Sequence, residues 1–336
     1  MQDLILLFLD LANETLAAAI VIIAVSLLLY NISRNFYDRV ARTSGIVLAA
    51  VMVAYVADVL ISLEPAPRVH EMLLRVQYIG ITLMPAALFH LSDALLDTTG
   101  LPSRGRRRRV IRIMYAISLT FLVAALFGDT MVEAVIIKGQ LRLHANMLFI
   151  PFLAFTVISA ISAFINVDRA RRRCLTRSTK NRMAYLEAAI LMPIFAIFPY
   201  SAILTSMQEV TWVELTIVNI ANVLVVLMLL FLSYPLSFFG SRVPDRVVKA
   251  ELLRFLLRGP MTALLVLGTI IYIRPASQIL SLPGDDFMPF AAVTMVLFWQ
   301  WMVHLTLPYL EKRLIYGDES EERLALVERL NSQLLT

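Results

Sequence analysis

The sequence has few charged residues and almost no cysteine. Asp, Glu, Lys and Arg make up 16% of the 336 residues, whereas they make up about a quarter of a soluble domain. Apolar residue types reach 59%, and the mean hydropathy is +0.76. This composition excludes an ordinary soluble globular protein. The single cysteine, Cys174, excludes an intramolecular disulfide framework.

The signatures of common enzyme classes are also missing. The chain has no glycine-rich phosphate loop, no His-Glu-x-x-His zinc motif and no Gly-x-Ser-x-Gly nucleophile elbow. The pair His70–Glu71 resembles the start of a kinase phosphoacceptor box but lacks the Arg-Thr-Pro continuation. We therefore expect no catalytic residue, no metal site and no cofactor in this chain.

Long apolar runs are abundant instead. A helix that crosses a bilayer needs ~20 mostly apolar residues, and nine windows of the sequence meet this requirement. We therefore predict an all-α, polytopic helical bundle in the membrane. The windows are about 13–31, 44–63, 72–96, 110–127, 146–166, 183–206, 212–234, 260–280 and 287–308.

The basic residues predict the orientation of these spans. Loops rich in Lys and Arg stay on the cytoplasmic side, and 25 of the 30 basic residues lie in alternate segments of the chain. Nine spans satisfy the rule at every loop, with the N-terminus outside, the C-terminus in the cytoplasm and the protein in a bacterial inner membrane. The positive net charge therefore indicates topology and attraction to anionic lipid, not binding to nucleic acid. The basic segments are 32–43, 97–112, 167–182, 235–259 and the tail after 310.

The chain is expected to have three parts. Residues 1–235 form a bundle of seven spans, and residues 236–310 add an amphipathic interfacial helix (242–259) and two more spans. Residues 311–336 form a charged cytoplasmic helix or linker. The N-terminus carries Asp3, Asp10 and Glu14, so we expect no cleavable signal peptide, which would be basic there.

The tail carries an apolar stripe of the coiled-coil type. Leu324, Val327, Leu330 and Leu334 follow one another at spacings of 3, 3 and 4 residues. A narrow stripe of this kind fits a two-helix seam, and we expect the chain to form a homodimer through it. The alternative is an amphipathic tail that lies on the membrane surface.

Polar residues inside the spans are candidates for a ligand pocket, because they are costly in hydrocarbon. Most of them fall in the predicted outer halves of the second, third and seventh spans. The alternative is that they only join helices by hydrogen bonds, with Trp212 an interfacial anchor. We expect Asp58 to face the bundle interior and to pair with Gln77 or Tyr78. The candidates are Tyr55, Asp58, Gln77, Tyr78, Trp212, Glu214, Asn219 and Asn222.

The third span resembles a stretch found in the seven-transmembrane sensor region of bacterial histidine kinases. The resemblance rests on Gln77-Tyr78, Gly80-Ile81, Pro85, Phe89 and Asp93, within residues 76–100. Residues 242–266 and the segment from Pro308 to the end are similar to the linkers that join such sensors to GAF and kinase modules. The resemblance implies an input domain for an unidentified small-molecule or membrane stimulus, with the output module supplied in cis or in trans.

Two other classes stay open at this point. A transporter or permease would be expected to show inverted repeats with interrupted helices, and the sequence shows no such repeat. An intramembrane enzyme or another polytopic assembly subunit is the remaining alternative. The sequence does not indicate the stimulus.

Overall fold

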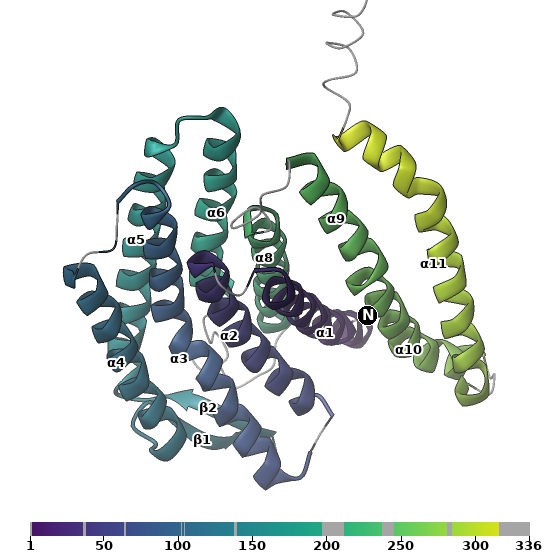
Figure 1. Cartoon of the computed structure of the whole chain (residues 1–336). Coiled ribbons are helices and arrows are strands. Elements are labelled where there is room, and N and C mark those ends of the chain that lie inside the picture. The colour runs from purple at the N-terminus through teal and green to yellow at the C-terminus, as the bar shows by residue number, and fades with distance from the viewer. Residues whose placement is uncertain are drawn as a thin grey trace, which may run out of the picture. The chain divides into compact units, whose positions relative to one another are not determined.

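The computed structural model describes residues 2–35, 38–63, 65–101, 103, 105–137, 140–196, 212–236, 245–280 and 284–315. Most of these residues belong to long helices (Figure 1). The chain divides into two compact units, Met1–Gly240 and Ser241–Thr336. The boundary lies five residues beyond the expected end of the seven-span bundle.

The first unit is a helical bundle with one β-hairpin. Most of its helices pack against the helices that precede and follow them in the chain, and α8 closes the bundle by packing against α1 and α6. Its elements are α1 (Gln2–Asn35), α2 (Arg39–Ile61), α3 (Pro67–Asp97), α4 (Gly105–Phe127), β1 (Val132–Ile137), β2 (Gln140–Ala145), α5 (Phe149–Arg173), α6 (Arg177–Ala196) and α8 (Trp212–Leu236).

Helix α3 is the central helix of this unit, packed against α2, α4 and α5 (Figure 1). Fifteen of its residues are buried, against three in α4. Helices α2 and α3 approach closely at Gly80, where an added Cβ would lie 2.1 Å from the Ala50 carbonyl oxygen and 2.9 Å from the Ala54 Cβ. Small residues let two backbones approach in this way. The pair α2–α3 therefore has no free space at this level.

The β-hairpin is a feature that the sequence interpretation missed. The strands pair antiparallel, with Val132 opposite Ala145 and Ile137 opposite Gln140. The strand 140–145 alternates polar and apolar residues, which is the period of a strand with one buried face. Residues on its inner face pack with the ends of α3, α4 and α5. This cluster contains Tyr78, Ala125, Met131, Val132, Leu143, Phe149 and Phe152.

The second unit contains α9 (Asp245–Arg258), α10 (Pro260–Leu280) and α11 (Gly284–Ile315). Helices α9 and α10 follow each other with one turn residue between them, because Gly259 N donates to Phe255 O and Ala263 N donates to Gly259 O. A candidate span accordingly runs over Ala250–Ile273, earlier than the expected 260–280. Helix α11 is held to this helix pair by hydrogen bonds from Trp299 Nε1 to Leu257 O and from Gln300 Nε2 to Thr262 Oγ1.

Eight helices among the described residues are long and apolar enough to cross a membrane. They confirm the expectation of an all-α, polytopic bundle. The remaining expected span, 183–206, begins within α6, and its residues after 196 lie outside the described part of the chain. The tail seam at Leu324, Val327, Leu330 and Leu334 also lies outside the described residues.

Candidate functional site

The first polar cluster lies in the half of the first unit that carries the hairpin. Gln77 Nε2 on α3 donates to Asp58 Oδ1 on α2 at 2.9 Å. Asp58 thus has the partner that the sequence interpretation expected. Such a hydrogen bond offsets part of the cost of placing a carboxylate within a span.

Hydrogen bonds between Tyr55 and two asparagine side chains continue from this cluster to α8 and α1. The Tyr55 hydroxyl, one turn before Asp58, donates to Asn222 Oδ1 at 3.0 Å, and Asn222 Nδ2 donates to Asn13 Oδ1 at 2.9 Å. Tyr55 is 8% exposed and Asn222 is 3% exposed. We call Asn13, Tyr55, Asp58, Gln77 and Asn222 the Asp58 network. It joins four helices, α1, α2, α3 and α8.

The other expected pocket residues have different surroundings. Tyr78 packs in the apolar cluster under the hairpin, and Trp212 is 57% exposed. Glu214 Oε1 pairs with Arg142 Nη1 of β2 at 3.0 Å. Asn219 Nδ2 donates to the Leu9 and Leu215 carbonyl oxygens. Only Tyr55, Asp58, Gln77 and Asn222 of the expected set therefore belong to the Asp58 network.

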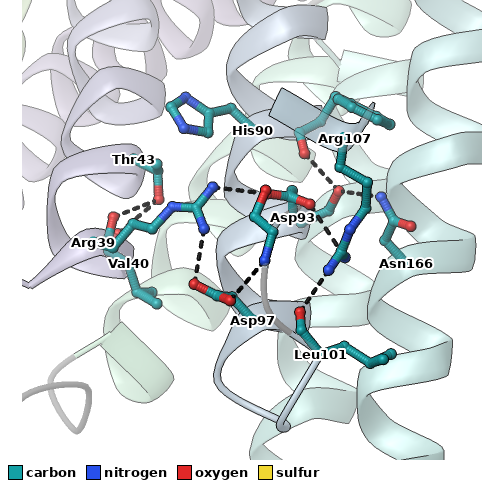
Figure 2. Close-up of polar contacts among 12 residues, drawn as sticks. Arg39, Val40, Thr43, His90, Asp93, Asp97, Leu101, Arg107 and Asn166 are labelled. Atoms are coloured by element: carbon teal, nitrogen blue, oxygen red, sulfur yellow. Dashed lines mark hydrogen bonds and ion pairs between the residues drawn. The ribbon is translucent and has the colours of Figure 1, made fainter. Parts of the chain in front are cut away.

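A second cluster, at the other end of α2 and α3, is ionic (Figure 2). Asp93 of α3 is 1% exposed and lies between two arginines: its Oδ2 is 2.7 Å from Arg39 Nη2, and its Oδ1 is 3.2 Å from Arg107 Nη1. Arg39 Nη1 also meets Asp97 Oδ2 at 2.8 Å. We call Arg39, Asp93, Asp97 and Arg107 the Asp93 cluster. Two guanidinium groups balance two carboxylates, so the cluster is neutral.

Local structure places each member of the Asp93 cluster. Asp38 accepts hydrogen bonds from Val40 N and Ala41 N, and this N-cap starts α2 at Arg39. Asp93 and Asp97 are four residues apart on α3 and therefore share a face. Ser103 N donates to Asp97 Oδ1 at 3.0 Å, and Arg107 Nη2 donates to Leu101 O, so Leu101 and Ser103 lie against the cluster.

His90 shares the face of Asp93 in the sequence, but it has another partner in the structure. Its Nδ1 lies 3.3 Å from the Tyr115 hydroxyl of α4, and the two rings meet edge to face. Two residues further along α3, Ser92 Oγ accepts a hydrogen bond from Asn166 Nδ2 of α5 at 3.1 Å. Both contacts fix α3 against its neighbours beside the Asp93 cluster, and Figure 2 shows His90 and Asn166 next to Asp93.

Sequence reasoning missed Asn13, Arg39, Asp97 and Arg107. The two arginines were counted only as signs of topology, and Asn13 lies at the edge of the first expected span. A signal for the Asp93 cluster was nevertheless present. Two carboxylates one turn apart at the end of an apolar helix, next to arginine-rich loops, need counter-charges.

A scan against models of known protein families found none that matches the chain, and a search of curated proteins found no match either. No group of three or more His, Cys, Asp or Glu side chains suited to a metal ion occurs among the described residues. The fold and the apolar helices identify the chain as a multi-pass membrane protein built as a helical bundle.

Proposed function

We propose that the chain is the membrane-embedded input domain of a bacterial signal-transduction receptor of the histidine-kinase type. In this proposal it lies in the inner membrane, acts as a homodimer and performs no catalysis itself. It passes a conformational signal through its C-terminal helix to a GAF or kinase module in cis or in trans. The stimulus is a small molecule or a property of the membrane.

One observation carries the proposal: α2 and α3 each contribute to both polar clusters. Helix α2 carries Asp58 in one cluster and Arg39 in the other, and α3 carries Gln77 and Asp93. At 1.5 Å per residue, the two sites on α2 are roughly 28 Å apart and those on α3 roughly 24 Å apart. Two closely packed helices therefore connect sites near opposite faces of the membrane.

The packing of α2 against α3 between the two clusters favours a discrete change in their relative position over a gradual one. Because Gly80 lies directly against the Ala50 backbone, the two helices cannot approach further. They can still slide or rotate along each other, as helices do in many switching proteins. A stimulus that separates Asp58 from Gln77 would favour such a shift.

The Asp93 cluster has alternative pairings to receive this shift. Arg39 already bridges Asp93 and Asp97, and Asp93 already meets both Arg39 and Arg107. A small movement of α2 along α3 exchanges these partners without leaving a charge unpaired. In our proposal, this set of pairings serves as the two-state element that transmission between distant sites requires.

The test is a chimera in which the full chain is joined after Thr336 to a kinase module with a reporter readout. Asp58→Asn changes the charge of the Asp58 network with almost no change in volume, and we expect reporter output to change at least about threefold. The matched control is Glu133→Gln, which neutralises an exposed carboxylate on the hairpin of the same unit. Unchanged output for Asp58→Asn in several linker registers would contradict the proposal.

A second measurement distinguishes a chimera whose junction does not transmit the change from a chain in which Asp58→Asn causes no change. Spin labels at Arg42→Cys and Thr98→Cys, both exposed near the Asp93 cluster, report the offset between α2 and α3 in a Cys174→Ser background. We expect Asp58→Asn to shift this distance distribution, and Glu133→Gln to leave it unchanged. Solute flux in proteoliposomes that is lost in Asp58→Asn would favour a transporter instead.

A further inference from the structure

The beginning of α4 has arginines on two opposite faces. Arg107 points inward to Asp93, whereas four other arginines of this segment are exposed, namely Arg108 and the set of Arg106, Arg109 and Arg112. Arg106, Arg109 and Arg112 follow one another at intervals of three, so they lie on one side of the helix within about 9 Å along its axis. Among the described residues, none forms an ion pair with any of the three.

The exposed arginine face continues directly into an exposed apolar face. Ile113 is 56% exposed, one turn beyond Arg109, and Val123 is 49% exposed further along α4. Only Ile111, Ser118 and Ala125 of this helix are buried. One side of α4 thus carries three guanidinium groups at its start and then a hydrocarbon surface along most of its length. The other exposed apolar residues of α4 include Ile117, Leu119 and Phe127.

We infer that this side of α4 is a binding site for an anionic phospholipid. The phosphate and its headgroup lie at Arg106, Arg109 and Arg112, and the acyl chains lie along Ile113 and the apolar residues beyond it. A free anion would use only the arginines, and a neutral lipid would use only the apolar surface. An amphiphile with a negative headgroup matches both parts in their order along the helix.

The residue type supports the same ligand class. A guanidinium group binds phosphate oxygens through two parallel N–H donors and is more weakly hydrated than an ammonium group. All three positions are arginine. The site is independent of the proposed sensor role, although it lies on the helix that also delivers Arg107 to the Asp93 cluster.

Fluorescence quenching in nanodiscs tests the site on the full chain. A fluorophore at Ala116→Cys, an exposed position of the same face, is introduced in a Cys174→Ser background. Brominated phosphatidylglycerol is then compared with brominated phosphatidylcholine at equal mole fractions. We expect phosphatidylglycerol to bind at least about fivefold more strongly than phosphatidylcholine. A single basic residue near an anionic surface contributes about this factor to the affinity. The triple variant R106Q/R109Q/R112Q is expected to lower this ratio to about one.

The matched control is R173Q/R177Q/K180Q. These residues are also exposed, carry the same total charge and lie at the end of α5 and in the first turn of α6. This variant should keep the preference for phosphatidylglycerol. An equal loss in both triple variants would overturn the site in favour of general charge attraction. Equal quenching by both lipids in the wild-type chain, or displacement of the lipid by millimolar inorganic phosphate, would overturn it as well.

Discussion

The carboxylate of Asp93 is almost fully buried and meets guanidinium groups from two other helices. Breaking a buried ion pair leaves an uncompensated charge, which costs several kcal/mol when both partners are shielded from water. Arg39 and Arg107 are each 29% exposed, so water compensates part of their loss. We predict that Asp93→Asn lowers the free energy of unfolding by about 2 kcal/mol, measured by thermal unfolding in detergent.

Asp168→Asn is the control for this prediction. Asp168 pairs with Arg172 on the surface, where Arg172 is 77% exposed, and exposed pairs contribute ~0–1 kcal/mol. Equal effects of the two substitutions would show that the Asp93 cluster contributes no more than a surface ion pair.

Gly80 has no room for a side chain between α3 and α2. In Gly80→Ala, the new Cβ would lie 2.1 Å from a backbone oxygen, which cannot move as a flexible side chain does. We predict a loss of roughly 1–3 kcal/mol in stability, as for other overpacked cores, measured by denaturant unfolding.

Gly45→Ala is the comparison on α2. Its Cβ would meet Leu28 Cδ1 at 3.7 Å, an ordinary contact, and alanine favours a helix by about 1 kcal/mol over glycine. A neutral or stabilising effect is therefore expected at Gly45. If Gly80→Ala is equally well tolerated, the close contact of α2 with α3 is not a constraint on the bundle.

At the scale of elements, the β-hairpin is attached to the bundle by one apolar face. Leu143 of β2 is 6% exposed within the cluster that contains Tyr78 and Phe152, whereas Ile136 of β1, on the same face but nearer the turn of the hairpin, is 72% exposed. Large-to-small changes in a packed core cost ~2–5 kcal/mol. We predict that Leu143→Ala exposes the hairpin to limited proteolysis and that Ile136→Ala does not. Equal cleavage of the two variants would contradict this attachment.

The helix expected from the tail sequence is the other element with a direct test. If Leu324, Val327, Leu330 and Leu334 form a parallel dimer seam, cysteines at these positions will crosslink in membranes. Cysteines at Ala325, Arg329 and Ser332 should crosslink weakly. Equal or absent crosslinking in both sets would favour a tail that lies on the membrane surface.

At the scale of the whole molecule, the basic residues predict one topology. The ends of α2 and α3 that form the Asp93 cluster face the cytoplasm in this arrangement, and the hairpin lies outside. A membrane-impermeant maleimide should therefore label Cys174 only from the cytoplasmic side. Met147→Cys, which is 82% exposed after the hairpin, should react only from the outside in a Cys174→Ser background. Labelling of both cysteines from the same side would contradict the nine-span topology.

The sequence by itself determined the class of the protein and the position of nearly every described helix. Apolar runs of membrane length and arginine-rich loops are local patterns, and a helix satisfies its own backbone hydrogen bonds in lipid. The partner of Asp58 was also predictable, because α2 and α3 are consecutive and Gln77 lies only 19 residues away.

Only the tertiary structure decided which distant polar groups meet. Tyr55 bonds to Asn222 across 167 residues, and Asp93 is neutralised by Arg39 from 54 residues away. Such pairs depend on how each helix is rotated about its axis and on which helices lie beside it. Both are set by the packing of the bundle, and the composition of the chain does not encode them. The hairpin was missed for a related reason: its strands are short, and their apolar face is buried only because residues of α3, α4 and α5 pack against it.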